Sequence, residues 1–333
     1  MRRALILSAL LATAAQASPA DTIGEATGAS LQADSKRAVA LLNGIDPASL
    51  SHKDRKFVTC MRERFASATP PVADKPRTFT DRALAIYQAY WHASLTRPET
   101  RDAQEKKLDA TLRKLLKAPK SADLDSLLEK RIEADGNHSL EGRTGLLREL
   151  MVWGKQDEKL MSVALPEGQY DVRVTYLDGF RSFGWSHYAT CGRAATGGWT
   201  TESGLFAVVP RYDSLDDEEF RVTFLGHEAQ HFADKARFPD LKPWELEYRA
   251  KLVEVALADK TRVKVLTRFV EDQGDDPKSP HSYADRRILG ELTKRLHLTA
   301  TEDLYTVDLK QLQAAARETL LDDTQQRHAA AAK

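Results

Sequence analysis

The chain has 333 residues, of which 42% are hydrophobic and 29% are charged, with 49 basic and 49 acidic side chains. These values are ordinary for a globular protein that forms one large domain or two smaller ones. A formal net charge of zero gives no general attraction to nucleic acid or to acidic membranes. No apolar run after the first twenty positions is long enough to span a bilayer. We therefore expect no nucleic-acid partner and no membrane span.

The first 17 residues have the three-part layout of a secretory signal peptide. Residues 1–3 are Met-Arg-Arg, residues 4–15 form an apolar core, and residues 15–17, Ala-Gln-Ala, are a small-x-small cleavage site. A buried N-terminal helix is the alternative, and the three-part pattern disfavours it. We expect residues 1–17 to be a signal peptide and the mature protein to begin near Ser18, in the periplasm or secreted.

Residues 18–160 are expected to form a helical N-terminal region. Apolar side chains recur there at helical spacing in four segments, residues 77–95, 99–117, 122–134 and 139–153. The charged residues between them are typical of solvated helix faces. This region therefore predicts a helical bundle or cap.

The chain contains two cysteines, Cys60 and Cys191. An even count in an exported protein permits one disulfide, which would join the N-terminal helices to the middle of the chain. Two buried free thiols are the alternative, and the spacing does not decide between them.

The character of the sequence changes near residue 161, and residues 161–325 are expected to form a second domain. Residues 169–177 predict a strand, and residues 204–212 predict another, which Pro210 places at a sheet edge. Residues 326–333 are expected to be a disordered tail. Four helices should follow the strands, over about 216–235, 244–271, 282–296 and 308–322. Few strands among many helices predict an α+β fold.

The most informative stretch is residues 227–231, His-Glu-Ala-Gln-His, within the expected helix 216–235. Positions i and i+4 of a helix lie on one face, so His227 and His231 can both reach one metal ion. Glu228 points off that line, where it can contact a water on the metal. Zinc lowers the pKa of such a water toward about 7, and a carboxylate can then accept its proton. This is the His-Glu-x-x-His signature of zinc proteases.

The flanking sequence favours a site over a chance pairing of two histidines on one helix face. A strand comes directly before the helix, and an edge strand can hold an extended peptide by main-chain pairing. Gly226 lowers helix stability by up to ~1 kcal/mol. A glycine there is understandable if another element packs closely against the turn that carries the metal.

The next expected helix contains a Glu-x-x-Ala pattern, Glu-Tyr-Arg-Ala at residues 247–250. With the histidine motif, this pattern resembles the gluzincins, zinc peptidases of zincin-like fold whose third ligand is a glutamate on a second helix. The resemblance implies Glu247 as the third ligand. Glu254, two turns further on, would orient an imidazole N–H, or would be the ligand itself if the register differs. Lys251 stands where some gluzincins carry an acidic residue.

Such an enzyme also needs a hydrogen-bond donor for the developing oxyanion, commonly a tyrosine or a histidine. The stretch Pro-His-Ser-Tyr at residues 280–283 offers His281 and Tyr283 for this role. An exposed loop histidine and a half-buried tyrosine are the alternative.

Together these features predict a secreted zinc metallopeptidase with a zincin-like catalytic domain and a peptide or protein substrate. Glu228 would act as general base beside a Zn²⁺ ion. An exported, catalytically silent zinc-binding or scaffold protein is one alternative, which the intact Glu228 disfavours. A helical interaction module without metal is another, which leaves the strand-helix-helix context unexplained.

Overall fold

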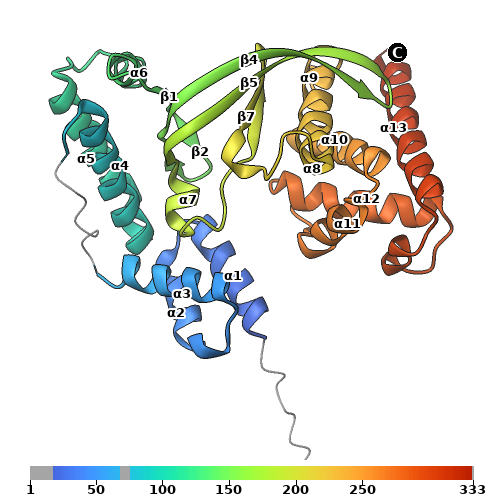
Figure 1. The fold of residues 1–333 in the computed structure, drawn as a ribbon, viewed down its shortest axis with the longest axis horizontal. Helices are drawn as coiled ribbons and strands as arrows, with labels where there is room; N and C mark the ends of the chain where they lie inside the picture. The colour runs from blue at the N-terminus through green and yellow to red at the C-terminus, as the bar shows by residue number, and fades with distance from the viewer. Residues whose placement is uncertain (1–17, 68–75, 332–333) are drawn as a thin grey trace, which may run out of the picture. The chain divides into compact units, whose positions relative to one another are not determined.

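The computed structural model describes residues 18–67 and 76–331 (Figure 1). The expected signal peptide, residues 1–17, lies outside the described residues. The fold is α+β, mostly helical, with a five-stranded sheet of order β1-β4-β5-β7-β6 and a two-stranded sheet of β2 and β3. Among the described helices, none has the length and apolar character needed to cross a lipid bilayer.

The chain divides into two compact units. The first is built from the residues up to Val152 together with Arg181–Ala195, and the second from Trp153–Phe180 together with the residues from Thr196 onward. The first boundary between the units lies after Val152 in β4 (Met151–Leu165), rather than between residues 160 and 161 as expected. Strands β4 and β5 (Gly168–Phe183) each supply residues to both units.

The first unit is formed mainly by helices. They are α1 (Pro19–Leu31), α2 (Ser35–Asn43), η1 (Pro47–Ser49), α3 (His52–Phe65), α4 (Phe79–Thr96), η2 (Pro98–Thr100), α5 (Arg101–Leu116), α6 (Leu124–Glu133) and α7 (Trp185–Ala189). Its short strands are β1 (His138–Leu140), β2 (Arg143–Thr144) and β3 (Leu147–Arg148). Helix α4 shows how the sequence sets a boundary: Thr78 and Asp81 form a capping box at its start. A core of apolar side chains from these helices holds the unit together.

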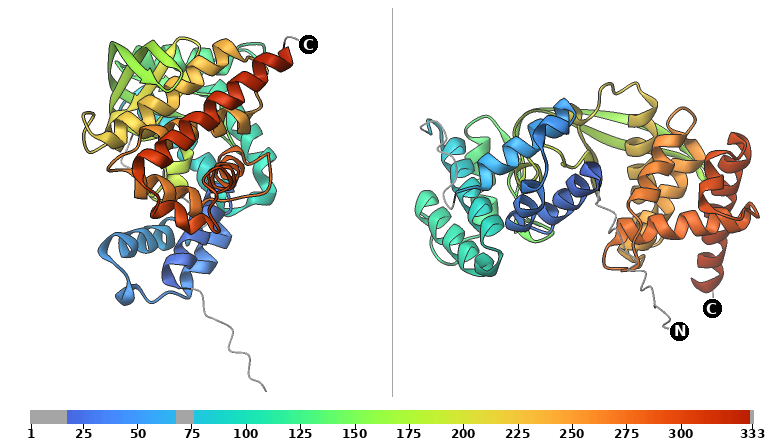
Figure 2. Two further views of the ribbon diagram at one scale, coloured as in Figure 1. Left: turned by 90° about the vertical axis from the view of Figure 1, so that its right-hand side faces the viewer. Right: turned by 90° about the horizontal axis from the view of Figure 1, so that it is seen from below.

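The second unit contains the remaining strands, β6 (Gly198–Thr201) and β7 (Gly204–Val208), and a second set of helices. These helices are η3 (Val209–Arg211), α8 (Glu218–Phe220), η4 (Arg221–Gly226), α9 (His227–Arg237), α10 (Pro243–Leu257), α11 (Arg262–Glu271), α12 (Pro280–Arg295), η5 (Thr301–Tyr305) and α13 (Leu309–Ala331). Helix α10 packs along both α12 and α13, and the three lie side by side in Figures 1 and 2. A second apolar core lies between these helices and the sheet.

Three expectations about the elements are corrected. Residues 139–153 form short strands and the start of β4 rather than a helix, because Gly142 and Gly145 adopt left-handed φ values of 99° and 57° that a helix does not accept. The expected helix 244–271 is two helices, α10 and α11. Residues 326–331, expected to be disordered, are the last turns of α13.

The edge strand beside the histidine motif is also different from the one expected. Strand β7 lies between β5 and β6, parallel to β5 and antiparallel to β6. Pro210 lies beyond the strand, in η3, so it places no constraint on the position of β7 in the sheet. The edge is therefore β6, which lies against α9.

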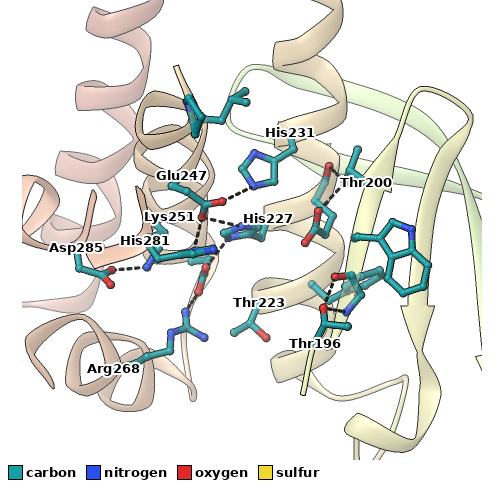
Figure 3. Close-up of a pocket in the computed structure, with 18 of the residues that line it drawn as sticks. Thr196, Thr200, Thr223, His227, His231, Glu247, Lys251, Arg268, His281 and Asp285 are labelled. Atoms are coloured by element: carbon teal, nitrogen blue, oxygen red, sulfur yellow. Dashed lines mark hydrogen bonds and ion pairs between the residues drawn. The ribbon is translucent and has the colours of Figure 1, made fainter. Parts of the chain in front are cut away.

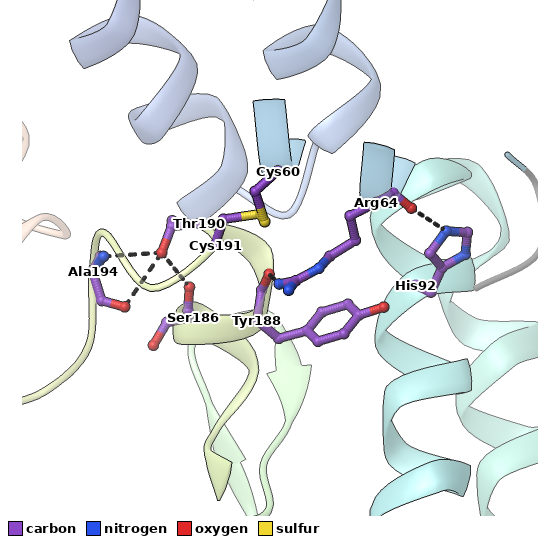
Figure 4. Close-up of a disulfide and its surroundings, with 8 residues drawn as sticks. All are labelled: Cys60, Arg64, His92, Ser186, Tyr188, Thr190, Cys191 and Ala194. Carbon is purple, nitrogen blue, oxygen red and sulfur yellow. Dashed lines mark hydrogen bonds between the residues drawn. A yellow bond between two sulfur atoms is a disulfide. The ribbon is translucent and has the colours of Figure 1, made fainter. Parts of the chain in front are cut away.

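The two cysteines form a disulfide within the first unit (Figure 4). It joins Cys60 on α3 to Cys191, directly after α7, across 131 positions of sequence. Beside it, the Arg64 guanidinium donates to the Tyr188 carbonyl oxygen and lies 4.6 Å from the centre of the Tyr188 ring. The disulfide therefore closes the long loop between the N-terminal helices and the segment that returns to them.

The helix that carries the motif is not uniform. The chain is helical from Glu218 to Arg237, but its middle, η4, is a π-helical stretch that ends at Gly226, directly before His227. A Cβ atom on Gly226 would lie 3.1 Å from Leu257 Cδ1 and 3.4 Å from Val253 Cγ1. Helix α10 therefore packs closely against the turn before the histidines, as the glycine predicted.

Replacing Cys60 and Cys191 together by serine should lower the free energy of unfolding of the first unit by about 2–5 kcal/mol, because the unfolded chain regains the freedom of a long loop. Thermal unfolding with and without reductant measures this. Reductant should destabilise the parent and leave the double variant unchanged. Equal stability of parent and double variant would contradict the expectation.

Gly226→Val should destabilise the protein by roughly 1–3 kcal/mol, because the new methyl groups enter the contact with α10. The matched control is Gly290→Val in α12, where no atom lies within 4 Å of a built Cβ. Denaturant unfolding compares the two. Similar losses in both variants would mean that the contact with α10 imposes no constraint.

Candidate metal centre

The two motif histidines lie on one face of α9, as their spacing requires. Their ring centres are 4.6 Å apart with the rings nearly perpendicular, and both residues are 8% exposed. Helix α9 ends at Arg237, and the following Phe238 precedes a proline, which disfavours helical backbone at that residue. The motif therefore lies between the π-helical stretch that ends at Gly226 and the end of the helix at Arg237.

Glu247 from α10 meets both histidines, as Figure 3 shows. Its Oε2 lies 3.5 Å from His227 Nε2, and its Oε1 lies 3.4 Å from His231 Nε2. One donor atom from each of the three residues lies within 4.8 Å of the others. Donors of a tetrahedral zinc site at bond lengths of about 2.0–2.1 Å are separated by about 3.3 Å. The carboxylate-to-imidazole separations match that spacing.

Glu254 lies behind His227. Its Oε1 is 2.7 Å from His227 Nδ1, and its other oxygen pairs with the Arg268 guanidinium. A carboxylate can only accept here, so Nδ1 carries a proton, which leaves Nε2, facing Glu247, as the nitrogen that a neutral imidazole would offer to a metal. Of the two roles expected for Glu254, the structure places it in the orienting one.

The acidic surroundings favour positive charge at the cluster. Burial opposes the charged form of His227, but the hydrogen bonds with Glu247 and Glu254 outweigh burial and raise its pKa to about 10. Burial likewise opposes the charged forms of Glu247 and Glu254, yet their histidine contacts lower the pKa of both carboxyls. A metal cation can replace the proton in such a setting, because imidazole binds metal in its neutral form.

Glu228 lies at the edge of the cluster and is held by strand β6. Its Oε2 accepts a hydrogen bond of 2.6 Å from the Thr200 hydroxyl, which also contacts the Glu228 carbonyl oxygen at 3.1 Å. The Glu228 side chain and the three cluster residues line one cavity of about 520 Å³. This volume is in the range of small-molecule sites.

The two expected oxyanion donors lie in different places. His281 lines the cavity, with Nδ1 2.9 Å from Glu247 Oε2, and its side chain is 63% exposed. Tyr283 does not line the cavity; its ring packs edge-on against Trp244, 5.2 Å away. Both residues are in the first turn of α12, where residues two positions apart point about 200° apart. Tyr283 therefore does not belong to the candidate site, contrary to the expectation.

Sequence reasoning missed a second row of contacts between α10 and α12. Lys251, one turn after Glu247, donates to Asp285 at 2.5 Å, and Asp285 lies one turn after His281. Burial raises the pKa of Asp285 to about 6, although Lys251 opposes the shift. The repeated four-residue spacing on both helices was visible in the sequence, but the pairing of these helices was not.

The donor set fits a zinc ion. Two imidazole nitrogens and one carboxylate oxygen are common zinc ligands. The carboxylate of Glu247 contacts imidazole nitrogens of His227, His231 and His281, and its charge is largely buried. A cation among these donors would balance that charge, so the residues present suit the metal that the motif predicts.

Comparison with protein-family models, with curated proteins and with solved structures finds no match to this chain. The candidate metal centre is therefore defined by its residues and their geometry alone.

Glu254→Gln should weaken zinc binding by about 10–100-fold without abolishing it, because the amide keeps the shape but no longer holds His227 as a charged acceptor. Competition with a chelating dye measures the affinity. Glu291→Gln, at a partly exposed position of α12 outside the cluster, is the control. An unchanged affinity would deny Glu254 an orienting role, and complete loss would make it a ligand.

Proposed function

We propose that this protein is an exported zinc metallopeptidase of the gluzincin type, which hydrolyses peptide or other amide bonds. The observation that carries the proposal is the convergence of His227 and His231 from α9 with Glu247 from α10 at zinc-ligand spacing. Glu228 beside them in the same cavity favours a hydrolase over a purely structural metal site. The sequence of residues 1–17 supports export.

The zincin-like fold is part of this proposal. It is supported by three neighbouring elements: a helix with the histidine motif, a second helix with the glutamate, and the edge strand β6 beside the first helix. An extended substrate can pair with the free edge of β6, and the cavity is lined by residues of this strand. This would place a peptide bond of the substrate beside the cluster.

Zinc held by His227, His231 and Glu247 would supply a Lewis acid that polarises the substrate carbonyl and acidifies water. Glu228 would accept the proton of the attacking water and return it to the leaving amine. The hydrogen bond from Thr200 would hold the Glu228 carboxylate in place for both transfers. His281, exposed at the rim, would donate to the developing oxyanion.

The test compares zinc content and peptide cleavage in the mature protein from Ser18 onward. The parent should bind zinc near one equivalent, and His231→Ala and Glu247→Ala should lose it. Glu228→Gln should keep the zinc and lose cleavage of a quenched fluorescent peptide mixture by about 10²–10⁴-fold, because only the proton acceptor is removed. Glu291→Ala, at a partly exposed position of α12 outside the cluster, is the control.

The outcomes separate the three hypotheses for function. Absence of bound zinc in the parent under zinc-replete conditions would overturn the proposal and leave a helical protein without metal. Bound zinc with equal, background cleavage by the parent and by Glu228→Gln would favour the catalytically silent zinc-binding protein. Loss of cleavage in Glu228→Gln with zinc retained supports the peptidase.

A further inference from the structure

A second cavity lies in the first unit, on the hairpin of α4 and α5. Its volume is about 430 Å³, which is within the range of small-molecule sites. Residues of α4 from Ala85 to Ala93, Arg97 directly after that helix, and residues of α5 between Gln104 and Thr111 contribute to its lining. The lining is mainly apolar and includes Ile86, Tyr90 and Leu108. We call this cavity the hairpin groove.

The groove is hollow because one face of α4 carries small side chains. Ala85, Ala89 and Ala93 follow each other at four-residue intervals, so they lie in a row along the helix. The row and Arg97 at its end extend over about 18 Å of helix, from a rise of 1.5 Å per residue. Larger side chains in this row would fill the space between the two helices.

Two cationic side chains line the groove, and neither has an acidic partner in the described part of the chain. Arg97 stands at the hairpin end and Lys107 on α5, and neither forms an ion pair with any residue that the structure describes. No aspartate or glutamate is among the described residues that line the groove. A ligand with an anionic head and an apolar body would complement both the cations and the alanine row.

A buried polar atom on the wall also lacks a partner. His92 is 0% exposed and lines the groove. Its Nε2 lies 3.0 Å from the Arg64 carbonyl oxygen, which can only accept, while its Nδ1 has no hydrogen-bond partner. Buried polar atoms are nearly always paired, so His92 leaves an unsatisfied acceptor in a wall that is otherwise mainly apolar.

We propose that the hairpin groove binds an aliphatic carboxylate, with its chain along Ala85, Ala89 and Ala93 and its headgroup near Arg97 and Lys107. The site lies in the first unit, and the metal cluster lies in the second. The proposal is therefore independent of peptidase activity.

Calorimetric titration of the mature protein with decanoate tests the site. We expect saturable binding of one equivalent of decanoate. The affinity for 1-decanol, which lacks the charge, should be lower by a factor of about ten or more. The double variant Arg97→Gln/Lys107→Gln should lose about tenfold in decanoate affinity for the same reason. Ala89→Phe should abolish binding by filling the groove. Lys106→Gln, an exposed neighbour outside the groove, is the matched control.

Three results would overturn the proposal. They are the absence of saturable decanoate binding, equal affinities for decanoate and 1-decanol, and unchanged binding by Ala89→Phe. Thermal unfolding of each variant establishes that it is folded. Zinc content, measured on the same samples, should stay at the parent value in every groove variant, which separates failure of this site from failure of the metal centre.

Discussion

The buried guanidinium of Arg249 joins the elements that carry the metal cluster. It is 0% exposed and bonds three carboxylates: Asp234 on α9 at 2.8 Å, Glu167 between β4 and β5 at 2.9 Å, and Asp323 on α13 at 2.6 Å. Arg249 is two residues after Glu247, and Asp234 is three residues after His231. The ion pair therefore fixes the distance between α9 and α10 close to the ligands. Removing one partner of such a buried pair costs about 3–5 kcal/mol, because the other charge stays buried without compensation.

The metal cluster depends on that fixed distance and on the packing at Gly226. Helix α10 approaches α9 closely enough for Glu247 to reach both histidines and for Glu254 to reach the far side of His227. Four ionisable side chains are thereby concentrated in a buried space, where each carboxylate favours positive charge on its neighbours. Arg268 balances Glu254, and the carboxylate of Glu247 still needs a proton on a neighbouring imidazole or a metal cation to balance it. The proposed zinc site is one way in which the fold compensates for that concentration of negative charge.

Local sequence signals located most of the elements but misplaced those whose identity depends on a partner. The helix containing residues 79–96 follows from a capping box and apolar spacing, and the helix containing residues 227–237 follows from the apolar residues that flank its histidine motif. Residues 139–153 have the apolar spacing of a helix, but two glycines in left-handed conformation and pairing with other strands make them strands. Strand β6 is the edge of the sheet because β7 is hydrogen-bonded to a strand on each side, and no property of the β7 sequence shows that it has two neighbours.

The 3.6-residue repeat of one helix sets the relation between His227 and His231, so the residues of the motif that could act together were evident before folding was considered. The sequence also identified Glu247 and Glu254 as candidates on one face of the next helix. Only the tertiary structure assigned their different places, since the approach of α10 to α9 decides which carboxylate faces Nε2 and which faces Nδ1. The same holds for His281 and Tyr283, which the sequence offered equally as oxyanion donors. The orientation of α12 about its axis brings His281 into the cavity and turns Tyr283 toward Trp244.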